Sequence, residues 1–272
     1  MKIATLLLAL IPASLATRTL HLAGDSTGAD GGSAGTVGWG KYLQDFFNPN
    51  EIKVNNGARG GRSTRTFLSD GSWAAIMKAT KPNDIVMIQF GHNDASPITD
   101  AKRSRGVLRG VDESFQDTVN GLTGKKERVY TFGHYLRTMI RETRAKGAIP
   151  VLVSKTLNKK WNTVTNRVDR GDRWSEWSFE VAKAEKTAFL DMRNLAADSW
   201  ERHGIQVLNK FFPTDGTHTS PKGARYNAIS VARAFWCTEM PQVTRALSKT
   251  GCRLAKPTQC YNSKPAVQKP EY

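Results

Sequence analysis

The stretch Asp84-Ile85-Val86-Met87-Ile88-Gln89-Phe90 decides the fold class of this 272-residue chain. Its four consecutive apolar residues are typical of a strand buried on both faces, because a strand with one solvated face alternates apolar and polar side chains. Such strands belong to parallel sheets that helices cover on both sides. The stretch runs into Gly91-His92-Asn93-Asp94, a polar turn at the carboxyl end of the strand, where open α/β sheets bind their ligands.

On either side of this stretch, apolar runs with strand character alternate with segments of helical spacing. The other strands are predicted at Thr19–Ala23, Ile52–Asn55, Ile149–Val153 and Ala188–Leu190, and the helices at Trp39–Phe47, Trp73–Ala79, Tyr130–Arg144, Glu176–Lys186 and Ala224–Trp236. Strands that alternate with helices predict an α/β fold with a doubly wound parallel sheet. We expect residues 17–272 to form one such domain.

The composition has one unusual feature, a large excess of basic residues. The chain has 40 Lys and Arg against 24 Asp and Glu, a formal net charge of +16, and its 39% of hydrophobic residues is enough for a core. That apolar content excludes wholesale disorder. The positive field predicts attraction to a polyanion, which is nucleic acid, an anionic membrane face or an acidic polysaccharide.

The first sixteen residues are typical of a secretory signal. Lys2 precedes an apolar run from Ile3 to Pro12, and small residues in Ala13-Ser14-Leu15-Ala16 predict cleavage after Ala16. The run is shorter than the ~20 apolar residues that span a bilayer, so we expect a secreted, extracellular protein without a membrane anchor. Secretion argues against nucleic acid as the partner and leaves extracellular polyanions.

Three cysteines, Cys237, Cys252 and Cys260, all lie near the carboxyl end. In an oxidising compartment they predict one disulfide that ties down a tail of about residues 237–272, and one free thiol. Cys237 follows an apolar helical segment and is the expected bridge member, while its partner is either Cys252 or Cys260. No paired cysteine or histidine spacing of a zinc site accompanies them, and we expect neither a metal nor a cofactor.

Two long polar segments, Ala95–Arg128 and Asn158–Arg173, interrupt the alternation after the carboxyl ends of predicted strands. Loops of this length in a compact domain are usually functional or disordered. Basic residues interleaved with tryptophan suit a polyanion built of sugar rings, and loops that are merely solvated and basic are the alternative. The residues predicted to contact substrate are Arg103, Arg105, Lys159, Trp161 and Trp174, with Trp177 as a further candidate for stacking on a sugar ring.

Four short polar segments carry the candidate chemistry. Gly24-Asp25-Ser26-Thr27 presents a serine hydroxyl at a turn after a strand, as a nucleophile requires, and the glycines of Gly57–Ser63 can present backbone N–H groups to an anion. The amide of Asn93 is a neutral donor suited to an oxyanion. In Asp215-Gly216-Thr217-His218, the carboxylate can bind one ring nitrogen of the histidine and leave the other for a hydroxyl.

Taken together and in this order, the four segments resemble the SGNH (GDSL-type) hydrolases over nearly the whole chain, from about Leu20 to Trp236. Within that superfamily, the chain is similar to the rhamnogalacturonan acetylesterases in the segments Leu22–Thr27, Gly38-Trp39-Gly40, Gly61-Arg62-Ser63, Phe90–Asp94 and Asp215–Pro221. The resemblance implies a flavodoxin-like fold of three layers, α/β/α.

The resemblance also implies a role for each site residue. Ser26 is the expected nucleophile, His218 the general base, and Asp215 the carboxylate that orients the histidine. The backbone N–H groups of Ser26 and Gly61, with the Asn93 side chain, are the expected oxyanion hole.

The sequence therefore predicts a secreted serine esterase that removes acetyl groups from pectic polysaccharide, specifically rhamnogalacturonan. The galacturonate of that polymer is acidic and fits the positive charge of the chain. The alternatives are another carbohydrate esterase of the superfamily, such as an acetylxylan esterase, and a non-catalytic module that binds acidic glycans. We expect a monomer with an acetylated acidic polysaccharide as its partner, and neither nucleic acid nor a membrane.

Overall fold

A computed structural model describes residues 17–32 and 35–261 of the chain. The predicted signal at residues 1–16 lies outside the described residues. Within the described ranges, no helix is both long and apolar enough to cross a membrane.

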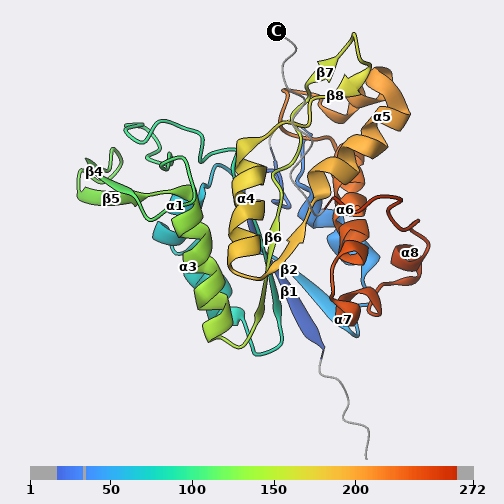
Figure 1. The fold of residues 1–272 in the computed structure, drawn as a ribbon, viewed down its shortest axis with the longest axis horizontal. Helices are drawn as coiled ribbons and strands as arrows, with labels where there is room; N and C mark the ends of the chain where they lie inside the picture. Colours follow the sequence, from blue (N-terminus) through green and yellow to red (C-terminus); the bar gives the residue numbers. More distant parts are fainter. Residues whose placement is uncertain (1–16, 33–34, 262–272) are drawn as a thin grey trace, which may run out of the picture.

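A five-stranded sheet with the order β2-β1-β3-β6-β9 forms the centre of the fold (Figure 1). Its strands are β1 (Arg18–Gly24), β2 (Ile52–Asn56), β3 (Ile85–Gln89), β6 (Ile149–Val153) and β9 (Ala188–Leu190). Every pair of neighbours is parallel. Because β1 lies between β2 and β3, the strand order reverses beside β1, as in flavodoxin-like sheets. The predicted doubly wound sheet is confirmed.

Helices cover both faces of this sheet and complete the α/β/α layers. One face packs against the 3₁₀ helix η1 (Trp39–Phe46), α5 (Met192–Phe211) and α6 (Pro221–Ala234). The other packs against α1 (Thr64–Ser69), α2 (Ser72–Ala79), α3 (Phe132–Ala145) and α4 (Arg173–Ala184).

Alternate residues of β3 divide between these two cores. Ile85 and Met87 pack with the helices of the first face, whereas Val86 and Ile88 pack with those of the second. None of the four is more than 1% exposed. The side-chain period of two therefore buries the whole apolar run, and β3 is the central strand that the sequence predicted.

Several helical segments differ from the sequence prediction. The segment at residues 39–46 is a 3₁₀ helix, and the sequence predicted neither α1 and α5 nor the short helices Pro241–Thr244 and Lys249–Cys252. Helix α1 has only six residues and begins at a capping box between Ser63 and Thr66, a signal too short to show periodicity. Helix α5 has 20 residues but contains Gly204 at a φ of 72°, which breaks its apolar spacing.

Both polar insertions contain antiparallel hairpins. In the first, β4 (Phe115–Val119) pairs with β5 (Lys126–Tyr130), and in the second, β7 (Trp161–Asn162) pairs with β8 (Arg167–Val168). The two hairpins stand on opposite sides of the molecule in Figure 1. Strand β4 has no buried residue, so its sequence lacks the apolar face by which a strand is predicted.

The carboxyl-terminal segment returns to the first face of the sheet through η2 (Phe235–Cys237), α7 (Pro241–Thr244) and α8 (Lys249–Cys252). A disulfide joins Cys237 to Cys260, and Cys252 is free and exposed. The prediction that Cys237 forms a bridge is confirmed, and Cys260 is its partner. The neighbouring Tyr261 hydroxyl donates to Asp198 of α5 at 2.9 Å, which anchors this end of the tail to α5.

Candidate active site

The four polar segments meet at the carboxyl end of the sheet. Ser26 follows β1, Gly61 lies between β2 and α1, Asn93 follows β3, and His218 precedes α6. All four line one cleft, together with Gly91, His92, Ala95, Arg103, Arg105, Lys155, Asn158 and Thr217. Segments separated by nearly 200 positions in the sequence are thus neighbours because parallel strands end at the same edge.

A line of hydrogen bonds joins Ser26, His218 and Asp215. The Ser26 Oγ lies 2.9 Å from His218 Nε2, and His218 Nδ1 lies 2.7 Å from Asp215 Oδ2. A carboxylate can only accept, so it favours a proton on Nδ1 and leaves Nε2 as an acceptor that faces the serine hydroxyl. A hydroxyl with a base within hydrogen-bond reach, and a third group that orients the base, is the arrangement that activates a nucleophile.

The turn that carries Asp215 also stabilises its charge. Its Oδ1 accepts the backbone N–H groups of Thr217 and His218, each at 2.7 Å. Partial burial raises the pKa of the Asp215 carboxyl, but the hydrogen bonds from the His218 backbone and ring and from Thr217 outweigh burial and lower the pKa to about 2. Asp215 is therefore ionised at any pH near neutrality.

Two neighbouring segments hold the turn Asp215–His218 in position. On one side, the Lys159 N–H donates to the Gly216 carbonyl at 2.7 Å. On the other, the Val37 N–H donates to the Thr219 carbonyl at 2.9 Å, and the Thr219 hydroxyl donates to the Val37 carbonyl at 3.1 Å. The histidine is therefore positioned by backbone contacts with segments far away in the sequence.

The side chain of Asn93 lies between a donor and an acceptor. Its Oδ1 accepts from Arg105 Nη1 at 2.6 Å, and its Nδ2 donates to the Arg62 carbonyl at 2.8 Å. The residue is buried yet lines the cleft beside Ser26. Because an amide nitrogen carries two hydrogens, Nδ2 can serve this carbonyl and a negatively charged oxygen in the cleft at the same time.

Two glycines of the cleft adopt backbone angles that other residues rarely reach. The φ of Gly61 is +76° and that of Gly91 is +130°. A Cβ on Gly91 would also lie 3.0 Å from the side chains of Lys155 and Trp174. Gly61 therefore needs glycine for its backbone angle alone, and Gly91 needs it both for the turn and for close packing beneath the site.

Asp94 fastens the turn after β3 to the start of α1. Its Oδ1 accepts the N–H of Thr64 at 2.8 Å and the Thr64 hydroxyl at 2.6 Å, and its Oδ2 accepts the Gly91 N–H at 3.0 Å. Complete burial raises the pKa of Asp94 to about 7, the hydrogen bonds oppose the rise, and the nearby Asp25 carboxyl adds to it. One buried carboxyl thereby couples the segments that carry Gly61 and Asn93.

Sequence reasoning missed Lys155, which follows β6 and could have been found from its place after a predicted strand. Its Nζ pairs with Asp172 Oδ1 at 2.7 Å, and both side chains are largely buried. Burial first, and then the positive charge of Lys155, hold the pKa of His92 well below its usual value. The neutral His92 ring lies 2.7 Å from the Thr156 hydroxyl through Nε2, which places it in the wall of the cleft.

The residues predicted to contact substrate lie in different surroundings. Arg103 and Arg105 line the cleft, and Lys159 and Trp161 line a separate hollow, which begins one residue after Asn158 of the cleft. Trp174 is only 8% exposed and packs edge-on against Phe132 and Trp177. The prediction for Trp174 is wrong, as is that for Trp177, because helix α4 directs both indoles into the core instead of toward the solvent.

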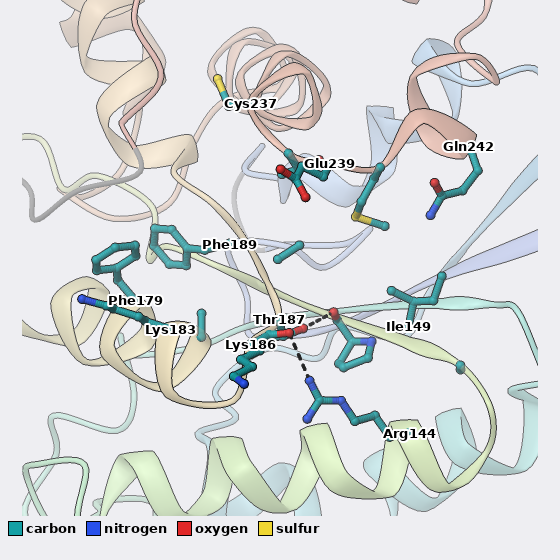
Figure 2. Close-up of a pocket in the computed structure, with 16 residues that line it drawn as sticks. Arg144, Ile149, Phe179, Lys183, Lys186, Thr187, Phe189, Cys237, Glu239 and Gln242 are labelled. Atoms are coloured by element: carbon teal, nitrogen blue, oxygen red, sulfur yellow. Dashed lines mark hydrogen bonds between the residues drawn. The ribbon is translucent and has the colours of Figure 1, made fainter.

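A second hollow lies at the opposite, amino end of the sheet (Figure 2). It is lined by Ile149 at the start of β6 and Phe189 of β9, with Phe179, Lys183 and Glu239 around them. Two of its polar side chains donate to backbone carbonyls: Arg144 Nη2 to that of Glu185 and the Thr187 hydroxyl to that of Pro150, each at 2.5 Å. None of the four polar segments reaches this hollow.

No group of three or more His, Cys, Asp or Glu residues in the described part of the chain is arranged to hold a metal ion. The chemistry available at the cleft is that of a hydroxyl, an imidazole and hydrogen-bond donors.

Comparisons with known proteins agree on a family and a fold. The model of the GDSL-like Lipase/Acylhydrolase family matches residues 22–226. A rhamnogalacturonan acetylesterase from Emericella nidulans is 31% identical over 237 residues, which cover 87% of this chain and 92% of that protein. The probable rhamnogalacturonan acetylesterase YesY from Bacillus subtilis is 28% identical over 222 residues, or 79% of this chain and 91% of that one.

Among solved structures, the YxiM protein from Bacillus subtilis superposes with a TM-score of 0.66 at 24% identity. The match covers 82% of this chain but only 57% of that structure, and the likeness is one of fold.

Proposed function

The chain belongs to the GDSL-like lipase/acylhydrolase family and is a carboxylic ester hydrolase, and from this premise we propose that it removes O-acetyl groups from rhamnogalacturonan, an acidic pectic polysaccharide. The observation that carries the proposal is the line of hydrogen bonds from Asp215 through His218 to Ser26, beside the Asn93 amide. The two relatives named above support the substrate class.

In the first half of the proposed reaction, Ser26 Oγ forms a bond to the acetyl carbonyl carbon while His218 Nε2 takes the hydroxyl proton. The carbonyl oxygen becomes an oxyanion, which the backbone N–H groups of Ser26 and Gly61 and the Asn93 amide stabilise. The bond between the carbonyl carbon and the sugar oxygen then breaks, and His218 returns the proton to that oxygen. The sugar leaves with a free hydroxyl, and the acetyl group stays on Ser26.

In the second half, a water molecule attacks the acetyl group on Ser26. His218 takes a proton from the water, the same donors hold the second oxyanion, and the proton passes to Ser26 Oγ as acetic acid departs. Because the pKa of Asp215 is lowered to about 2, its carboxylate is charged throughout and stabilises the imidazolium that forms twice in each cycle.

The positive charge around the cleft supports an acidic polymer as the substrate. Arg103 lies in the cleft wall, and Lys159, Lys160 and Trp161 line the separate hollow that begins after Asn158. Cations attract the galacturonate carboxylates, while an indole offers an apolar face to a sugar ring. A chain of sugars placed across both would present one acetyl group to Ser26.

We also propose that the enzyme is secreted and acts as a monomer. The Cys237–Cys260 disulfide supports an oxidising compartment, where such bonds form and persist. A cleft built entirely from one chain supports a monomer, because the proposed reaction needs no residue from a second copy.

The test is acetate release from acetylated rhamnogalacturonan, acetylated xylan and a small chromogenic acetate. The proposal expects the highest kcat/KM on rhamnogalacturonan, and no acetate release above the uncatalysed rate from the Ser26→Ala variant on any substrate. Ser114→Ala, at an exposed serine remote from the cleft, is the matched control and keeps wild-type rates. A clear preference for xylan would contradict the pectic substrate. Release that persists in Ser26→Ala would contradict the nucleophile, and no release by the wild type would favour a glycan-binding module.

A further inference from the structure

The cleft contains an arginine whose side chain points at another side chain of the proposed site. Arg105 Nη1 donates to Asn93 Oδ1 at 2.6 Å, and its Nε donates to the Ser96 hydroxyl at 2.9 Å. Two N–H groups of the guanidinium are therefore engaged within the protein. This is an unusual use for a residue that the sequence pattern placed among the substrate contacts.

These contacts fix which way the Asn93 amide faces. An arginine can only donate and a carbonyl can only accept, so the amide oxygen must face Arg105 and the amide nitrogen must face the Arg62 carbonyl. A flipped amide would set N–H against N–H on one side and oxygen against oxygen on the other. The NH₂ group is thereby held facing Arg62, the residue that follows Gly61 of the proposed oxyanion hole.

The positive charge of the Arg105 guanidinium also strengthens the Asn93 amide as a hydrogen-bond donor. A cation on the amide oxygen stabilises the resonance form with negative oxygen and positive nitrogen, so the Nδ2 hydrogens become stronger donors. Hydrogen bonds to ionised groups are roughly twice as strong as neutral ones. A donor that is polarised before the reaction begins needs no reorganisation when the oxyanion forms.

We propose that Arg105 is a positioning residue, which orients and polarises the Asn93 amide for the oxyanion without binding the sugar. The proposal rests on the proposed function, in which Asn93 is an oxyanion donor. Arg105 belongs to the polar insertion after β3, whose start folds back on the Asn93 turn: the Ser96 N–H donates to the Asn93 carbonyl, and the Val107 N–H to that of Asp94, both at 3.2 Å. The insertion thus contributes to the chemical step as well as to the surface of the cleft.

A double-mutant cycle on the small chromogenic acetate tests the proposal, because this substrate has neither charge nor sugar for an arginine to bind. Arg105→Met keeps the length of the side chain and removes its charge and its donors. We expect kcat to fall roughly ten-fold to a hundred-fold with KM unchanged, which is less than the roughly 10²–10³-fold of losing the donor itself. Arg105→Lys, which keeps the charge but not the planar fork, should recover part of kcat.

The decisive comparison is with Asn93→Ala. If Arg105 acts through Asn93, the Arg105→Met/Asn93→Ala double variant is no slower than Asn93→Ala alone. Effects that multiply would overturn the proposal, as would a raised KM with unchanged kcat in Arg105→Met. The control is Arg109→Met, at an exposed arginine of the same insertion, which keeps the wild-type kcat on this substrate.

Folding and the nucleophile are checked separately. Thermal unfolding of each variant shows whether it is folded, and Arg105→Lys replaces Arg105→Met in the cycle if the latter does not fold. Ser26→Ala that still hydrolyses the acetate would overturn the proposed function. An inactive Ser26→Ala together with independent effects at positions 93 and 105 would overturn the role of Arg105 alone.

Discussion

The two ends of the parallel sheet both carry a hollow, but only one of them gathers reactive groups. At the carboxyl end, Ser26, Asn93 and His218 come from three different loops and point into a common cleft. At the amino end, the hollow of Figure 2 is lined by Ile149 and Phe189 with Lys183 and Glu239 around them, and two of its side chains donate to backbone carbonyls.

This difference shows which end of a parallel sheet can form a reaction site. Loops that leave the carboxyl ends bring polar side chains together from across the sheet, and the reversal of strand order beside β1 opens a crevice between them. At the amino end, apolar side chains and the last turns of helices cover the sheet. Size alone therefore does not identify a reaction site, whereas convergent, mutually bonded polar groups do.

The largest expected effect is that of removing the proposed base at the carboxyl end. His218→Ala should lower kcat by about 10⁴-fold or more, because the proposed nucleophile Ser26 then has no proton acceptor. Phe189→Ala at the amino end should leave kcat unchanged and lower the free energy of unfolding by about 1–3 kcal/mol, since that ring is partly buried. Steady-state kinetics and denaturant unfolding measure the two. A Phe189→Ala variant that is folded but loses turnover would contradict the expectation that only the carboxyl-end cleft carries the reaction.

The next largest effect is expected from a neutral amide at the carboxyl end of the sheet, and a neutral amide at the amino end is its control. Asn93→Ala should lower kcat by roughly 10²–10³-fold, because one of the proposed donors to the oxyanion is lost. Gln242→Ala, at an amide that lines the amino-end hollow, should leave kcat unchanged. The measurement is hydrolysis of a small acetate at saturation. Turnover of Asn93→Ala close to the wild-type value would remove this side chain from the oxyanion hole.

A smaller effect concerns the cations at each end. Arg103→Ala and Lys159→Ala should each raise KM for acetylated rhamnogalacturonan a few-fold, and raised salt should do the same in the wild type, because ions screen exposed charges. KM for a small neutral acetate should not respond to salt. Lys183→Ala, at an exposed lysine of the amino-end hollow, is the matched control. If salt changed KM equally for both substrates, the positive charge would be a general property of the surface and would have no specific role in binding the acidic polymer.

The smallest effect is on how stability depends on pH. The pKa of Asp94 is raised from 3.8 to about 7, so the folded state holds a proton that the unfolded chain releases between these values. Stability from this group is therefore present at low pH and lost as the pH rises from about 4 to about 7. Asp94→Asn removes the titration, so its unfolding midpoints should depend less steeply on pH across this window, even though it also weakens the Gly91 contact.

The control for that measurement lies at the amino end. Glu239→Gln replaces an exposed carboxyl of the second hollow and should keep the wild-type slope. A wild type and an Asp94→Asn variant with the same slope would mean that Asp94 does not hold a proton in the folded protein near pH 6.

The sheet and the residues of the cleft could be predicted because each carries its signal locally. The apolar run in β3 shows its burial on both faces, and Ser26, Asn93 and His218 stand in recognisable segments at strand ends or before a helix. Trp174 could not be placed in this way, because its sequence neighbours are basic and its partners Phe132 and Gly91 are distant in the chain. The same holds for Arg105, whose bond to Asn93 depends on how the insertion folds back.

The separation of the reacting groups along the chain has a consequence for how activity is acquired. Ser26 and His218 are 192 positions apart. An isolated antiparallel β-bridge between the backbones of Phe47 and Leu247 closes a loop of similar length on the same face of the sheet. Bringing such distant segments together costs loop-closure entropy before their contacts can stabilise the chain. Contacts of this kind therefore form late in folding. During synthesis, Ser26 is made long before His218, and the proposed triad cannot assemble until the last helices have docked. In the proposed reaction, partly folded chains would therefore be inert toward esters, and the return of turnover after denaturation would mark the closing of the fold.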